Sequence, residues 1–245
     1  MIASLLIFIS LLVSASLVYG DVGIITAITK DTDSLRRCLI NGKKIHKANR
    51  DFFKGMLNGK QIIICRSPMG KINNAITAQL LISEFHVEKV FSLGFAGALS
   101  ASVKTHDILV ADKIFQHDIG VEKPYGFVGE DKLGRRTDTE LTERLMQKLA
   151  IVDKLKAFRG DLVSGDQFIA STEKKNQLYK RYGALAVDTN SAAIIQVCEA
   201  NEIRCAIIRI ISDEADVMAR TRFEQSVRQS DNSRLISALL EVAGE

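Results

Sequence analysis

The chain has 245 residues, of which 47% are hydrophobic and only two are proline, a composition typical of one ordinary globular domain. Its formal net charge of +4 is spread along the sequence, tryptophan is absent, and other aromatic residues are sparse. We therefore expect no nucleic-acid partner, because the sequence has neither a concentrated basic run nor a base-stacking surface. The four cysteines show no metal-ligand spacing, so no metal and no cofactor is expected.

The first 20 residues differ from the rest of the chain. They contain no charged side chain, and an apolar run over residues 5–13 is followed by small residues. This pattern predicts a secretory signal peptide, cleaved after Ala15 or Gly20, and hence a periplasmic or secreted protein. Because the segment lacks an initial Lys or Arg, an uncleaved membrane anchor facing outside is the main alternative, and a buried N-terminal helix is the third. Residues 21–245 are predicted to form a single domain.

Strands and helices alternate along the rest of the chain. The expected elements are strands at 22–28, 87–93, 107–115, 158–163, 184–187 and 205–211, a hairpin at 52–66, helices ending near residues 39, 85 and 201, further helices at 139–151, 173–181 and 222–242, and a surface loop or lid at 120–137. Asn58-Gly59 predicts a type I′ turn in the hairpin. Because both hairpin and crossover connections occur, we predict an α/β protein, a three-layer αβα fold with a central mixed, twisted sheet.

Polar residues follow two of these strands, within the stretch 184–213. The first strand ends in the polar residues 188–190, and the β-branched strand after the next helix ends in Ser212 and Asp213. A crossover helix brings two such ends to one edge of a parallel sheet, where ligands bind in open α/β folds. Any one of these residues is explained as well by helix capping. Their convergence on one edge favours a ligand site.

Three further features allow more than one interpretation. A glycine turn at 94–97 follows a buried strand and lets the backbone approach a ligand closely. His117 follows another strand and is interpreted as structural rather than catalytic. Cys198 and Cys205 flank one helix-to-strand turn, where they either pair or act as small buried hydrophobic residues, the reading we favour.

Seven segments now form one pattern in the order of the chain. They are GIITAI at 23–28, SPMGK at 67–71, GFAG at 94–97, HD at 117–118, SGDQFI at 164–169, AVDTNSAA at 186–193 and IIRIISDEAD at 207–216. Together they resemble the purine nucleoside phosphorylase/uridine phosphorylase superfamily. Within it, the chain is most similar to the 5′-methylthioadenosine/S-adenosylhomocysteine nucleosidases, and the likeness extends from about residue 22 to residue 242.

This resemblance implies a homodimeric enzyme that cleaves the N-glycosidic bond of an adenine nucleoside. Asp213 would donate a proton to the leaving base, a role typically worth about 10²–10⁴-fold in rate, with Ser212 and Arg209 as its supports. Phe168 would stack on the purine, and the backbone of Ile169 would read its edge. Further contacts are implied for Met69, Ile28 and Phe223 around the 5′ substituent, for Phe95, Ala96 and Gly97 in the glycine turn, and for Val121 across the partner's site.

The chain departs from the family pattern at the residues that the resemblance implies for ribose binding. The family's acid–methionine–glutamate run is Asp188, Thr189 and Asn190 here, so an uncharged amide replaces the glutamate that would bind the ribose hydroxyls. Charge-assisted hydrogen bonds are roughly twice as strong as neutral ones. The glutamate implied to activate water is Asp31, which is one methylene shorter, and the serine of the glycine turn is Phe95. Base recognition is thus expected to be intact and ribose recognition altered.

One position separates hydrolysis from phosphorolysis. Phosphorylases of this superfamily place a phosphate-binding arginine two residues before the glycine turn, and this chain has Ser92 there. We therefore predict an exported nucleosidase with an altered ribose site. A catalytically weak or inactive nucleoside-binding protein is the second hypothesis, and a nucleoside phosphorylase is the third.

Overall fold

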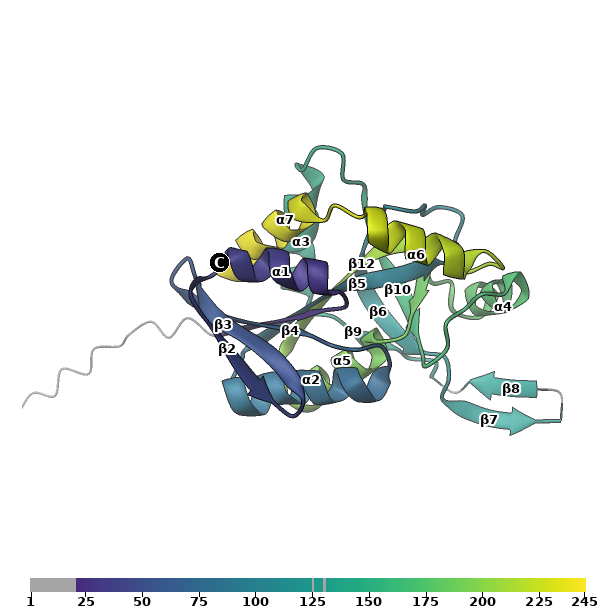
Figure 1. Cartoon of the computed structure of the whole chain (residues 1–245). Helices are drawn as coiled ribbons and strands as arrows, with labels where there is room; N and C mark the ends of the chain where they lie inside the picture. The colour runs from purple at the N-terminus through teal and green to yellow at the C-terminus, as the bar shows by residue number, and fades with distance from the viewer. Residues whose placement is uncertain (1–20, 125, 130) are drawn as a thin grey trace, which may run out of the picture.

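A mixed, twisted sheet lies between two layers of helices (Figure 1). The computed structural model describes residues 21–124, 126–129 and 131–245. The segment predicted as a signal peptide or anchor, residues 1–20, lies outside this part of the chain. Within the described part, no helix is both long and apolar enough to cross a membrane. The predicted three-layer α/β class with a mixed sheet is confirmed.

The strands combine parallel and antiparallel neighbours in the order β11-β10-β6-β12-β5-β1-β4-β3-β2, with β9 beside β6. Because β11 pairs with both β10 and β5, five of these strands close into a small barrel. Their bounds are β1 Val22–Thr26, β2 Ile40–Lys47, β3 Arg50–Leu57, β4 Lys60–Arg66, β5 Lys89–Ala98, β6 Ile108–Gln116, β9 Arg135–Arg136, β10 Ala157–Ser164, β11 Ala186–Asp188 and β12 Arg204–Asp213. β12 lies centrally, parallel to β5 and antiparallel to β6.

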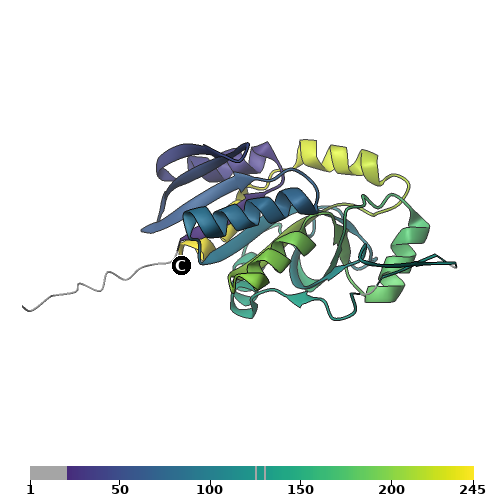
Figure 2. The same ribbon diagram turned by 90° about the horizontal axis from the view of Figure 1, so that it is seen from below.

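Each face of the sheet has its own hydrophobic core. α2 and α5 pack on one face, and α1, α3 and α7 pack on the other (Figures 1 and 2). The helices are α1 Thr29–Arg37, α2 Lys71–Phe85, α3 Thr139–Ala150, α4 Thr172–Tyr182, α5 Ser191–Ala200, α6 Ala219–Gln229 and α7 Ser233–Gly244. As predicted, β12 is buried almost throughout, which a strand covered by helices on both faces requires.

The hairpin prediction is confirmed. β3 and β4 pair antiparallel up to Leu57 and Lys60, which leaves Asn58 and Gly59 as the two turn residues. Both have positive φ, 50° and 81°, as a type I′ turn requires. The strand before this hairpin, β2, was not predicted from the sequence. Its side chains are almost all exposed, because β2 is an edge strand rich in lysine, so it lacks the apolar alternation that marks a strand.

The long helix predicted at 222–242 is wrong, because the chain breaks at residues 230–232 into α6 and α7. Short polar side chains make local backbone contacts at this break and compete with the helix. The hydroxyl of Ser230 donates to the carbonyl of Val227 at 3.0 Å, and the carboxylate of Asp231 accepts from the backbone of Ser233 at 3.1 Å. Only α7 then packs its apolar face into the core.

The segment predicted as an irregular loop or lid contains regular structure. β7 (Gly120–Lys123) and β8 (Gly126–Gly129) form a separate two-stranded hairpin, which extends away from the rest of the molecule (Figure 1). β9 returns the chain to the sheet. The pairing of Cys198 with Cys205 does not occur: both thiols are free and buried, which fits the reading as small hydrophobic residues.

Candidate active site

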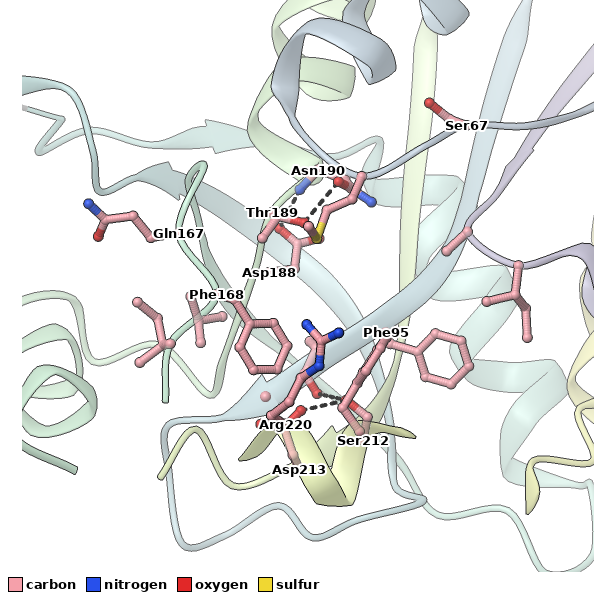
Figure 3. A pocket seen from close by; sticks show the side chains of 18 residues that line it. Ser67, Phe95, Gln167, Phe168, Asp188, Thr189, Asn190, Ser212, Asp213 and Arg220 are labelled. Atoms are coloured by element: carbon pink, nitrogen blue, oxygen red, sulfur yellow. Dashed lines mark hydrogen bonds between the residues drawn. The ribbon is translucent and has the colours of Figure 1, made fainter. Parts of the chain in front are cut away.

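The carboxyl ends of the strands meet around a cavity of about 140 Å³ (Figure 3). The sheet edge at which residues 184–213 predicted a ligand site therefore borders a cavity, and most of the predicted site residues line it. The lining consists of Ala27, Ile28, Ser67, Met69, Phe95, Ala96, Gly97, Gln167, Phe168, Ile169, Val187, Asp188, Thr189, Asn190, Ser212, Asp213, Arg220 and Phe223. Two predicted residues, Asp31 and Arg209, are not part of this wall.

Asp213 lies at the end of β12 and is 2% exposed. Its Oδ2 accepts a hydrogen bond from the hydroxyl of Ser212 at 2.7 Å, and its Oδ1 accepts from the backbone of Ala215 at 2.9 Å. Burial raises the pKa of this carboxyl, and the two hydrogen bonds only partly oppose that shift. A Cβ at Gly97 would lie 2.7 Å from Oδ1, so the glycine is needed here for space. A buried carboxyl with a raised pKa is thereby placed on the cavity wall.

Three phenylalanines form an aromatic corner beside Asp213. The ring of Phe223, on α6, meets Phe95 at a centroid distance of 6.0 Å and Phe168 at 5.8 Å, both edge to face. Such geometry is favourable for aromatic rings beyond the area that they bury. Phe168 remains 37% exposed, which leaves one ring available to a flat ligand. An aromatic surface next to a proton donor suits a heterocyclic base.

Asn190 and Thr189 form the opposite end of the cavity. The side-chain oxygen of Asn190 accepts from the backbone N–H of Gly70 at 3.0 Å and from the hydroxyl of Thr189 at 3.0 Å. Asn190 precedes α5, but its side chain makes no capping hydrogen bond to that helix. The capping alternative therefore does not apply to Asn190. It applies to Asp188, whose Oδ1 accepts from the backbone of Ser191 at 3.2 Å.

Arg209 is paired with Asp188, which corrects its predicted role as a support of Asp213. Its Nε donates to Oδ2 of Asp188 at 2.6 Å, and both side chains are almost completely buried. The remaining guanidinium nitrogens donate to Ser92, to Ser191 and to the carbonyl of Ile208. The sequence could not show the contact between Arg209 and Ser92, because the two residues lie 117 positions apart. Ser212 does contact Asp213 as predicted.

The predicted role of Asp31 in activating water is not supported by its position. Asp31 lies in the first turn of α1 and is 1% exposed. Its Oδ1 accepts from the side-chain amide of Asn232 at 2.8 Å, so the carboxylate points to the turn between α6 and α7. Burial raises its pKa, against the opposing effects of Asn232 and Lys30.

A charged clasp joins the two loops that flank the cavity. Lys71 donates to both oxygens of Asp118 at 2.7 Å, and Asp118 also accepts from the backbone of Asp166 at 2.7 Å. Burial alone would raise the pKa of Asp118, but the hydrogen bonds from Lys71, Asp166 and Gln116 lower it overall. The clasp therefore holds the loop of Met69 against the loop of Phe168.

His117, beside this clasp, is 3% exposed, and its imidazole ring makes no hydrogen bond to the described residues. Burial lowers its pKa, which favours the neutral imidazole. Its ring packs so close to Gly165 that a Cβ there would lie 2.6 Å from Nε2. His117 lies outside the cavity wall, consistent with the structural reading from the sequence.

Several lining residues were missed from the sequence. Ser67 and Gln167 belong to the segments SPMGK and SGDQFI, so the motifs themselves could have indicated them. Arg220 could not have been found in this way, because it lies on α6 outside every motif. It is largely exposed at the cavity and donates to Glu224 at 2.7 Å.

Residues 21–243 match the phosphorylase superfamily, so the chain belongs to that superfamily. The aminodeoxyfutalosine nucleosidase of Helicobacter pylori strain J99 is 32% identical over 213 residues, which cover 85% of this chain and 92% of the relative. The 5′-methylthioadenosine/S-adenosylhomocysteine nucleosidase of Staphylococcus epidermidis is 31% identical over 226 residues, 90% of this chain and 99% of the relative. Both relatives are nucleosidases.

The same agreement holds for a solved structure. The 5′-methylthioadenosine/S-adenosylhomocysteine nucleosidase of Neisseria meningitidis in complex with methylthio-immucillin-A matches with a TM-score of 0.81 and 27% identity. The match covers 92% of this chain and 98% of that chain. The resemblance found in the sequence is therefore confirmed.

Proposed function

We propose that this chain is a nucleosidase that hydrolyses the N-glycosidic bond of an adenine nucleoside carrying a 5′ substituent, with an altered ribose site. The observation that carries the proposal is Asp213, a buried carboxyl with a raised pKa that lies beside three phenylalanine rings on the cavity wall. Both relatives are nucleosidases, and the name of one of them gives 5′-methylthioadenosine and S-adenosylhomocysteine as its substrates.

The proposed chemistry begins with a proton transfer. Phe168 stacks on the purine, and the protonated carboxyl of Asp213 donates to a ring nitrogen as the bond between the base and C1′ breaks. The bonding electrons leave with the base, the sugar carbon becomes electron-poor, and water adds there with loss of a proton. Burial keeps Asp213 protonated at pH values at which an exposed aspartate is ionised, and thus makes it a general acid.

Water is the proposed acceptor rather than phosphate. Arg209 is buried outside the cavity wall, and its guanidinium donates to Asp188, Ser191, Ser92 and a backbone carbonyl. Ser92 itself is 2% exposed and accepts from Arg209 instead of facing the cavity. Within the described cavity wall the basic residue is Arg220, which is largely exposed and ion-paired.

A nucleoside-binding protein with weak or no turnover is the second candidate. It is favoured by the sugar end of the cavity, where Asn190 carries no charge, Asp188 is neutralised by Arg209, and Asp31 points away. Among the described residues at this end of the cavity wall, Asp188 is the one carboxylate, and its pairing with Arg209 leaves it little capacity to stabilise a cationic sugar. Electrostatic groups of this kind are commonly worth about 3–4 kcal/mol in the transition state.

One assay separates these candidates. The protein is incubated with 5′-methylthioadenosine and with adenosine, with and without phosphate, and free adenine and the sugar product are quantified. We expect adenine and free sugar at equal rates in both buffers. Strict dependence on phosphate with a sugar phosphate as product would overturn the hydrolase, and saturable binding without adenine release would establish the binding protein.

We also propose export and a homodimer. Export rests on the apolar, uncharged residues 1–20, and an intact Met1 on a cytoplasmic protein would refute it.

The homodimer is supported by the β7–β8 hairpin, which extends from the molecule and carries Val121 with 45% of its surface exposed. Light scattering of the wild type should give twice the chain mass, and Val121→Asp should shift it toward the monomer. A monomeric wild type at micromolar concentration would exclude this role for the hairpin.

A further inference from the structure

The orientation of the Asn190 carboxamide is fixed by its neighbours. A backbone N–H can only donate, so the Asn190 atom that lies 3.0 Å from the nitrogen of Gly70 must be the oxygen. The hydroxyl of Thr189 donates to the same oxygen at 3.0 Å. Both contacts are made to the oxygen Oδ1, so the other polar atom of the carboxamide is the nitrogen Nδ2.

This nitrogen has no hydrogen-bond partner among the described residues, although Asn190 lines the cavity. Figure 3 shows it on the side of the amide away from Thr189. The amide nitrogen carries two hydrogens and accepts none. At this point the cavity wall therefore presents donors, whereas a glutamate at the same position would present only acceptors.

The neighbouring carboxylate does not reverse this polarity. Asp188 accepts at Oδ2 from Arg209 and from the hydroxyl of Ser191, and at Oδ1 from the backbone of Ser191 and Asn190. With four hydrogen bonds and a buried arginine beside it, Asp188 has little capacity to accept from a ligand hydroxyl. The sugar end is thus a donor site.

We infer that Asn190 determines specificity by donating from its amide nitrogen to a sugar oxygen of the ligand. The inference rests on the proposed function, in that the ligand is an adenine nucleoside. A carboxylate needs hydroxyl hydrogens on the sugar, and it rejects an oxygen that has none because its own lone pairs are left unpaired. A donor has no such requirement. The site therefore takes adenine nucleosides whose 2′ or 3′ oxygen is only an acceptor, as in a ribose ether or ester.

The test exchanges one atom. Asn190→Asp keeps the size of the side chain and the oxygen that accepts from Gly70, and replaces the NH₂ by an oxygen. Dissociation constants are measured by calorimetry for a carbon-linked adenosine analogue, which cannot be hydrolysed, and for its 2′-O-methyl and 3′-O-methyl ethers. For each protein, the dissociation constant of a methyl ether is divided by that of the unmethylated analogue. The steric effect of each methyl group is the same in both proteins, so a difference between the two quotients reports the hydrogen-bond polarity of residue 190.

We expect at least one of the two methyl groups to weaken binding to Asn190→Asp about tenfold more than binding to the wild type, the size of one hydrogen bond. Asn176→Asp makes the same charge change on the exposed part of α4 and should behave as the wild type does. Equal methylation penalties in wild type and Asn190→Asp would overturn the inference.

A measurement without ligand separates this inference from the proposed function. In the unliganded protein, the amide hydrogen of Gly70 should be protected from solvent exchange in wild type and Asn190→Asp and lose protection in Asn190→Ala. Unchanged exchange in Asn190→Ala would show that Asn190 does not accept from Gly70, and would overturn the donor orientation. If no analogue binds to either protein, the nucleoside function fails, while the exchange result still decides the orientation.

Discussion

The two ends of the cavity are built on opposite principles. At the purine end, Asp213 is buried with hydrogen bonds from Ser212 and Ala215 but without a cationic partner, so its raised pKa leaves it able to give a proton. At the sugar end, Asp188 is equally buried but is paired with Arg209 at 2.6 Å. These two buried carboxylates, at the ends of β11 and β12, thus differ in what they can do, because only one of them has a counter-ion.

This difference teaches that a carboxylate on the cavity wall is not in itself a reactive group. Asp188 fixes the start of α5 and the side chain of Arg209 by accepting from both. The groups that donate to Asp213 are uncharged, so they hold the position of its carboxyl group without supplying a counter-ion. We therefore expect substitutions at the purine end to change chemistry and substitutions around Asp188 to change stability.

The largest effect is expected at Asp213. Asp213→Asn removes the transferable proton and should lower kcat by about 10²–10⁴-fold, the usual contribution of a general acid, while the dissociation constant of the nucleoside changes little. Adenine release and calorimetry measure the two quantities. Near wild-type turnover in this variant would exclude the proposed mechanism.

The raised pKa of Asp213 gives a matching pH dependence. The acid form exists below the folded-state pKa, so kcat/KM should fall as the pH rises through that value. The same burial means that Asp213 stabilises the fold most at low pH and less once it ionises. A rate that rises with pH over this window would contradict the assignment of Asp213 as the acid.

The second largest effect is expected at Arg209. Arg209→Met leaves the carboxylate of Asp188 buried without a counter-ion, which typically costs about 3–5 kcal/mol in the free energy of unfolding. Thermal and urea unfolding measure this loss, and Asp188→Asn in the same chain should restore part of it. Arg220→Met is the matched control, because its exposed pair with Glu224 is worth at most ~0.5 kcal/mol. Equal losses of unfolding free energy in Arg209→Met and Arg220→Met would refute the distinction between the buried and the exposed ion pair.

A gain of roughly tenfold in kcat/KM is expected from Asn190→Glu, a fraction of the 3–4 kcal/mol that such groups can supply. A carboxylate there would accept from the ribose hydroxyls and stabilise the electron-poor sugar. Asn176→Glu, on the exposed part of α4, controls for the added charge. If a well-folded Asn190→Glu variant shows no gain, the sugar end serves another ligand, and the binding-protein hypothesis takes first place.

The smallest effect on rate is expected at Asp31. Asp31→Asn should leave kcat/KM within about threefold, or less than ~0.7 kcal/mol, because the side chain contacts Asn232 and not the cavity. Burial raises the pKa of Asp31, so its ionised form destabilises the fold as the pH rises through that value. The variant should therefore gain more thermal stability, relative to wild type, at pH values above the raised pKa than at pH values below it. A large loss of rate would restore Asp31 as the water-activating residue.

The sequence predicted what depends on local pattern. β-branched runs identified the buried strands, Asn58-Gly59 identified the turn, and polar residues after strands identified the edge that forms the cavity. It could not predict where buried side chains find partners. Asp31 meets Asn232 across 201 positions and Arg209 meets Ser92 across 117, and both contacts exist only after the layers pack. β2 was missed because an exposed edge strand carries no apolar period.

The position of β12 has a consequence for how the molecule is made. It is the last strand in the sequence, yet it lies between β5 and β6 at the centre of the sheet. Chains grow from the N-terminus at about 5–20 residues per second. Until residue 213 has left the ribosome, β5 and β6 lack their shared neighbour and expose unpaired backbone N–H and C=O groups, as non-local sheets do before closure. The strand that completes the sheet also delivers Asp213, so a growing chain gains its proton donor and its closed core in the same step.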